Sequence, residues 1–193
     1  MKKLLLLPGL LLASAGLFAQ QIAVFAKGEF SVLDSGTVTP APKDQAKAAF
    51  LAAYQADLAR PAAFAAPLAL SAPPEWGRTV AGAAGTIQFH GAFPGGFVVR
   101  VALEGLVPGH KYILCLNGNP ALAGNDLLVD AVPNNGKERY FDFLTAATNA
   151  AGRYQATFGL ALPASPYDVR FYVKDTDDFK IVLYHDYFKF AVK

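Results

Sequence analysis

The chain has 193 residues and a single cysteine, with 17 Lys and Arg residues against 15 Asp and Glu. One cysteine excludes an internal disulfide framework, and no basic block is present that would neutralise nucleic-acid phosphates. A nucleic-acid partner is therefore not expected. Hydrophobic residues make up 53% of the sequence, with 15 Phe and 8 Tyr, so stability must come from a buried core.

Residues 1–19 are expected to form a secretory signal peptide. Lys2 and Lys3 precede a short apolar run at residues 4–12, and small residues up to Ala19 provide a cleavage site. The run is shorter than the roughly 20 residues of a membrane helix, so no stable membrane span is expected after cleavage. Loss of the two lysines leaves 15 basic against 15 acidic residues. We expect a near-neutral protein that is secreted, periplasmic or held at the cell surface.

Residues 20–60 are expected to form an N-terminal hairpin plus a helix. Two short apolar runs and a turn within residues 20–41 predict the hairpin. Residues 42–60 predict a helix, because Pro42 suits a first helical position and Pro61 ends the run. Few basic residues flank its apolar face, so docking on its own domain is favoured over a partner or a membrane surface. The apolar face consists of Ala46, Phe50, Ala53, Tyr54 and Leu58.

Residues 61–78 are rich in Ala and Pro and lack periodicity. This composition predicts a linker or an extended strap on the surface. Trp76, the only Trp of the chain, is expected to plug the edge of the following domain.

Residues 79–193 are expected to form an antiparallel β-sandwich domain. Gly and Pro clusters divide this region into short segments in which apolar and polar residues alternate. Such alternation is typical of antiparallel strands with one face on a core and one in water. Many short strands in sequence predict a sandwich or barrel. The expected strands span residues 85–90, 97–104, 111–117, 139–145, 153–161, 167–174, 179–184 and 187–192.

Two segments share a corner motif. Pro108 precedes Tyr112 in "LVPGHKYILCL", and Pro163 precedes Tyr167 at the same spacing in "LPASPYDVRFYV". Both segments resemble the tyrosine corner of immunoglobulin-like and fibronectin type III-like sandwiches, in which the Tyr hydroxyl bonds back to the turn and the ring enters the core. The resemblance implies an immunoglobulin-like sandwich and carries no functional residues with it.

No catalytic sequence motif is present, and no cofactor is expected. His90, His110 and His185 are far apart in the sequence. A β-fold could bring His90 and His185 together with Cys115 in a copper or zinc site, although the spacing does not require it. An enzyme with a His/Asp site that sequence does not reveal is kept as an alternative.

Acidic residues suggest one weak alternative, a calcium site. Asp175, Asp177 and Asp178 are candidate ligands, since calcium favours several oxygen ligands from loops. A second group of oxygen-bearing residues lies within residues 124–130, in a long Asn- and Gly-rich loop at 117–138. Asp and Asn also favour ordinary turns, so a plain hairpin loop at residues 175–178 is the preferred interpretation.

The best candidate binding surface is the outward face of the last strands. The predicted ligand-binding residues are Arg100, Arg170, Tyr172, Lys180 and Tyr184. Tyr172 and Tyr184 are expected to lie near each other, with both arginines nearby. Tyr rings flanked by cations suit sugar rings or a protein partner. Two ordinary alternatives remain: the Tyr pair only stabilises the sheet, or the helix or the strap covers it.

These observations predict an exported, non-catalytic binding or structural module of the cell envelope or exterior. Its expected partner is a protein or a glycan at the cell surface. One alternative is a subunit of a surface assembly that uses strand addition, with the apolar segment "IAVFA" as a donor strand.

Overall fold

The computed structural model describes residues 20–26, 29–33, 45–59, 64–119, 121–122, 125 and 139–193. The predicted signal peptide and Pro42 lie outside the described residues. The described part of the chain forms two β-sheets and one helix, α1 (Gln45–Ala59). The first sheet has six strands in the order β2 (Glu29–Val32), β1 (Gln20–Ala26), β9 (Tyr154–Ala161), β6 (Gly96–Glu104), β4 (Ala84–Phe89) and β3 (Leu68–Leu70). The second has five strands in the order β5 (Ala92–Phe93), β11 (Ile181–Val192), β10 (Ser165–Asp175), β7 (Lys111–Gly118) and β8 (Arg139–Ala147).

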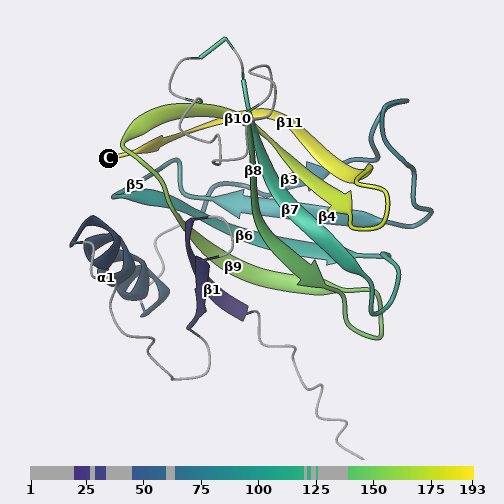
Figure 1. Ribbon diagram of the computed structural model, residues 1–193, viewed down its shortest axis with the longest axis horizontal. Helices are drawn as coiled ribbons and strands as arrows, with labels where there is room; N and C mark the ends of the chain where they lie inside the picture. The colour runs from purple at the N-terminus through teal and green to yellow at the C-terminus, as the bar shows by residue number, and fades with distance from the viewer. Residues whose placement is uncertain are drawn as a thin grey trace, which may run out of the picture.

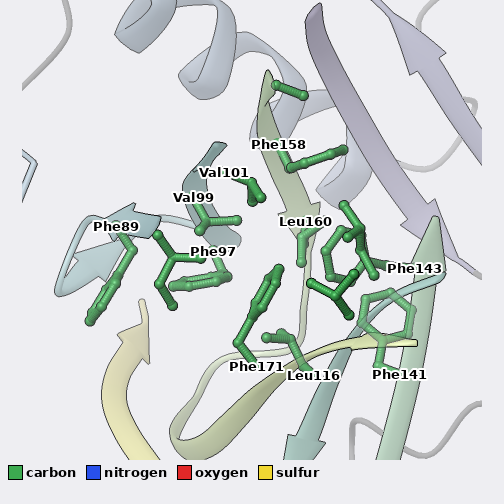
Figure 2. Packing of buried hydrophobic residues seen from close by; sticks show 14 of the residues in the cluster. Phe89, Phe97, Val99, Val101, Leu116, Phe141, Phe143, Phe158, Leu160 and Phe171 are labelled. Atoms are coloured by element: carbon green, nitrogen blue, oxygen red, sulfur yellow. The ribbon is translucent and has the colours of Figure 1, made fainter. Parts of the chain in front are cut away.

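The two sheets lie one above the other, and their inner faces form the main core (Figure 1). Alternate side chains of each strand enter this core, as the sequence alternation predicts. Phe158 of β9 and Phe171 of β10 are fully buried, and Figure 2 shows them on opposite sides of the same packed layer. Burial of one such Phe side chain contributes about 1.5–3 kcal/mol to stability. The prediction of a mainly β fold is confirmed.

Both sheets are mixed, which differs from the antiparallel arrangement that the sequence predicts. β1 pairs with β9 in parallel, and the two-residue strand β5 pairs with β11 in parallel. Alternation reveals which side chains are buried but not the direction of a neighbouring strand. A parallel pair needs a long connection instead of a hairpin, and β1 and β9 lie far apart in the chain. The parallel pairs mean that the strand arrangement does not establish the predicted immunoglobulin-like topology.

Both corner motifs form the expected contacts. The Tyr167 hydroxyl donates to the Pro163 carbonyl oxygen at 2.9 Å, and the Val107 N–H donates to the Tyr112 hydroxyl at 3.2 Å. Both tyrosine rings lie in the main core, each 1% exposed. The two motifs thus fix turns that precede β7 and open β10, whatever the topology of the sheets.

Residues 64–78 form a strap that links the two sheets. β3 pairs with β4 at one edge of the six-stranded sheet. Immediately after it, Ser71 exchanges two backbone hydrogen bonds with Tyr184 of the other sheet, at 2.7 and 2.9 Å. The Arg78 N–H donates to the Ile181 carbonyl at 2.8 Å. The predicted domain boundary at residue 79 therefore does not separate two units. β3 before the boundary pairs with β4 after it, and β1 likewise pairs with β9.

Helix α1 docks on the outer face of the six-stranded sheet, as predicted (Figure 1). Phe50, Leu51 and Tyr54 of the helix form a second core with strand residues that include Val98. The Tyr54 hydroxyl donates to the Thr157 carbonyl at 2.9 Å. A side chain at Gly159 would meet the Tyr54 ring at 2.5 Å, so glycine is required where the helix contacts β9. The helix therefore covers the outer face of the six-stranded sheet.

Candidate binding face

The outer face of the five-stranded sheet gathers aromatic rings and paired charges. In β10, Val169, Phe171 and Val173 enter the core, so the side chains between them point outward. We call this surface the aromatic face. Its members are Trp76, Asn117, Tyr140, Asp142, Arg170, Tyr172, Lys174, Tyr184, Asp186 and Tyr187.

A Trp and two Tyr rings form its centre. Tyr172 and Tyr184 are paired directly across β10 and β11, which confirms that they are neighbours. Trp76 of the strap lies edge-on to Tyr184, with ring centroids 5.3 Å apart, and 6.0 Å from Tyr172. Tyr172 is buried and Tyr184 is half-buried, whereas Trp76 is 49% exposed. The strap therefore shields Tyr172 but leaves a surface of Trp76 and Tyr184 in reach of solvent.

A β-bulge shapes the region beside these rings. Asp186 and Tyr187 of β11 both oppose the single residue Arg170 of β10. The Arg170 Nε donates to Asp186 at 2.8 Å, and its guanidinium lies 4.3 Å from the centre of the Tyr187 ring. The hydrogen bond from Arg170 lowers the pKa of Asp186. The bulge thus places an ionised acid–base pair and a partly exposed ring on the aromatic face.

A second charge pair lies on the side of β8. Lys174 contacts Asp142 at 2.5 Å, and its ammonium group lies 5.1 Å from the centre of the Tyr140 ring. Cys115 of β7 lies under this pair, opposite Tyr172. Burial raises the pKa of the Cys115 thiol well above its ordinary value, against the smaller opposing effect of Lys174. A thiol held protonated in this way is a weak nucleophile, so Cys115 serves packing.

The structure separates two predicted ligand residues from the others. The prediction that Arg100 lies near Tyr172 is wrong. Arg100 belongs to β6 in the other sheet, and its guanidinium lies 4.4 Å from the centre of the Phe64 ring. The alternation of β6 places Arg100 outward correctly, but it cannot show which sheet holds the strand. Lys180 lies in the exposed turn between β10 and β11, at the end of the aromatic face. Arg170, Tyr172 and Tyr184 are brought together.

Of the three candidate calcium ligands, Asp175 ends β10, and Asp177 and Asp178 lie in the hairpin loop that follows it. The buried Asp175 carboxylate accepts hydrogen bonds from the Asp177 N–H at 2.8 Å and from His110 at 3.0 Å, and it forms an ion pair with Arg78. Arg78 also contacts Asp178 at 3.4 Å. Burial alone would raise the pKa of Asp175, but these bonds and the charges on His110 and Arg78 outweigh it and lower the pKa. Arg78 therefore already occupies one oxygen of Asp175 and one of Asp178, two of the three candidate calcium ligands.

The three histidines lie in different environments. His90 contacts Asp57 of α1 at 3.0 Å and is buried against the Phe64 ring. His110 is engaged by Asp175, as described above. His185 contacts the Ala69 carbonyl at 3.1 Å, at the junction of β11 with β3. The proposed grouping of His90, His185 and Cys115 is therefore wrong, because the three residues lie on different elements with separate partners.

Sequence reasoning missed three important members of the aromatic face. The sequence predicts that Trp76 plugs a domain edge, whereas it packs against Tyr172 and Tyr184. A single Trp close to a predicted outward face is the signal that could have placed it there. Asp186 falls between the expected strands at residues 179–184 and 187–192, and Tyr187 is the first residue of the second. In the structure β11 continues through both residues with a bulge, so both side chains share one face. No signal in strict alternation reveals a bulge.

Comparison with models of known protein families, with curated proteins and with solved structures finds no match for this chain. Within the described residues, no helix is long and apolar enough to cross a membrane.

Proposed function

We propose that the protein is an exported, non-catalytic binding module that holds a neutral glycan on the aromatic face. The observation that carries this proposal is the grouping of Trp76, Tyr184 and Tyr187 around the Arg170–Asp186 pair. Trp76 is 49% exposed and Tyr187 is 37% exposed, so both rings can meet a ligand.

The rings supply flat apolar surface with little conformational freedom to lose. Tyr and Trp present large rigid contact areas with a polar tip, which makes them effective anchors in binding sites. Trp76 and Tyr184 lie nearly perpendicular, at 76°, so the surface is stepped rather than flat. A ring-shaped ligand with alternating C–H and hydroxyl groups can contact such steps along one side.

The paired charges favour a neutral partner. Arg170 is neutralised by Asp186 and Lys174 by Asp142. An anionic ligand would have to compete with these acids, whereas sugar hydroxyls can accept from the guanidinium and donate to the carboxylate at once. A guanidinium beside a carboxylate therefore offers neighbouring donor and acceptor positions for two adjacent hydroxyl groups.

A glycan array probed with the purified protein tests the proposal, followed by calorimetric titration of any glycan that binds. Trp76→Ala and Tyr187→Ala are each expected to weaken binding about 10- to 30-fold, the effect of removing an aromatic anchor. Phe179→Ala is the matched control. Phe179 is 66% exposed in the hairpin turn, outside the aromatic face, and its loss is expected to leave affinity unchanged.

Failure to bind any glycan, or binding that survives loss of both rings, would contradict the proposal. Binding only to anionic glycans would contradict its neutral character. Capture of a protein that competes at Trp76 would point instead to a protein partner on the same surface.

Strand addition is a second candidate, supported by one feature. Among the described strands, β8 pairs with β7 alone and spans nine residues, so it forms a long edge. An unpaired edge of this length can accept a strand from another molecule. A sedimentation experiment that shows a monomer across a wide concentration range would argue strongly against self-assembly by this route.

A further inference from the structure

The exposed rings of the aromatic face form two separate groups along β11. The strap bonds to the first half of this strand through backbone groups of Ile181 and Tyr184, and the Trp76 ring contacts the ring of Tyr184 there. Tyr187 lies at the bulge, and its ring contacts the guanidinium of Arg170 instead. The aromatic face therefore offers a first platform at Trp76 and Tyr184 and a second platform at Tyr187.

The two platforms are too far apart for one sugar ring to cover both. Tyr184 and Tyr187 are three positions apart on β11, and a strand advances about 3.3 Å per residue, so their backbones are separated by roughly 10 Å. Trp76 lies beside the stretch of β11 from Ile181 to Tyr184, which leads away from Tyr187. A pyranose ring is about the size of one aromatic ring, so it contacts one platform at a time.

Polar groups lie in the interval between the two platforms. Arg170 of β10 opposes the bulge and pairs with Asp186 there. Its Nη1 atom lies 3.5 Å from the hydroxyl of Tyr172, which is paired with Tyr184 at the first platform. The Arg170 and Asp186 side chains are 33% and 66% exposed, so both can reach a ligand. A chain that crosses from one platform to the other would therefore meet a donor and an acceptor between them.

We propose, on the premise that the aromatic face binds a neutral glycan, that the ligand is an extended oligosaccharide that lies along β11 and contacts both platforms at once. The platforms are arranged along one extended strand, so a straight chain of sugar rings matches them and a coiled chain does not. Chains of β-linked sugars, as in cellulose and chitin, are extended, whereas the α-linked chains of starch coil. Once one platform holds such a chain, the second binds it intramolecularly, which raises the affinity.

Calorimetric titration of the purified protein with oligosaccharides derived from cellulose and from chitin tests the extended ligand. Each series runs from the monosaccharide to the hexasaccharide. In at least one series the affinity is expected to rise about 10- to 30-fold once the chain spans both platforms, and then to level off, because the second platform acts as one further aromatic anchor. Starch-derived oligosaccharides of the same lengths should show no such rise.

Variants of the two exposed rings locate the effect. Trp76→Ala and Tyr187→Ala should each remove the rise with chain length, because each leaves one complete platform at most. The shortest chain that binds measurably should lose affinity in only one of these two variants. Tyr187→Phe is the matched control, since it keeps the ring and should keep the rise. The wild-type length series decides the question even if Trp76→Ala does not fold.

The outcomes separate the extended ligand from glycan binding as such. The extended ligand is overturned by a monosaccharide that binds as tightly as the hexasaccharide, by an equal rise with starch-derived chains, or by a rise that persists without either ring. It is also overturned if neither β-linked series binds while another neutral glycan does. In all these cases glycan binding on the aromatic face stands, whereas failure to bind any glycan removes both proposals.

Discussion

Replacing Gly159 with Ala should loosen the docking of α1 on the six-stranded sheet. The new Cβ would lie 2.5–2.7 Å from three carbon atoms of the Tyr54 ring. Carbon atoms in contact prefer about 3.5–4.0 Å, so the ring must withdraw by about 1 Å. Overpacking of this kind costs about 1–3 kcal/mol, and strain on the bond from Tyr54 to the Thr157 carbonyl adds about 1 kcal/mol. We expect a total of about 2–4 kcal/mol.

Thermal unfolding followed by circular dichroism measures this loss. For a chain of this length the Tm should fall by about 5–15 °C. Gly91→Ala is the matched control, because its Cβ would meet no atom within 4 Å and its backbone does not require glycine. A Gly-to-Ala substitution also lowers the conformational entropy of the unfolded chain, and this effect is present in both variants, so it cancels in the comparison. If Gly159→Ala melts at the same temperature as Gly91→Ala, the helix is not docked as described.

Three further results are expected. The folded-state pKa of Asp175 is lowered, so its contribution to stability is present above the unfolded-state pKa and is lost as the pH falls through the folded-state pKa. Asp175→Asn should therefore reduce the fall in the urea-measured free energy of unfolding between about pH 5 and pH 2. Phe158→Ala should reduce the urea-measured free energy of unfolding by about 3–5 kcal/mol, and a loss below about 1 kcal/mol would contradict its place in the core. Tyr167→Phe removes only the hydroxyl bond to Pro163, so about 0.5–1.5 kcal/mol should be lost in the same assay, and no loss would mean that the corner bond is dispensable.

Alternation predicted much of the fold because burial acts on one strand at a time. Every second apolar side chain of β6 and β10 enters the core, as alternation predicts, and Phe171 is fully buried. The tyrosine corners were also predictable, since each depends on residues a few positions apart. The helix docks on its own domain, although Leu51 is buried beside the expected residues.

Features that depend on contacts between distant segments were not predictable in the same way. Arg100 and Arg170 look alike in alternation, yet they lie in different sheets, because strand order is set by packing of the whole chain. β3 lies within the Ala/Pro-rich strap and has only three residues, too few for a periodic signal. Asp186 and Tyr187 share a face through the bulge, which breaks the two-residue period.

The strap also has a mechanical consequence. Its first end is paired with β4 in one sheet, and Ser71 and Arg78 are bonded to β11 in the other. Sliding one sheet along the other would pull on this connection and would have to break its backbone bonds together. Trp76 lies between Ser71 and Arg78, the two residues of the strap that are bonded to β11. A ligand bound to the Trp76 ring would therefore resist sliding of the two sheets at this connection.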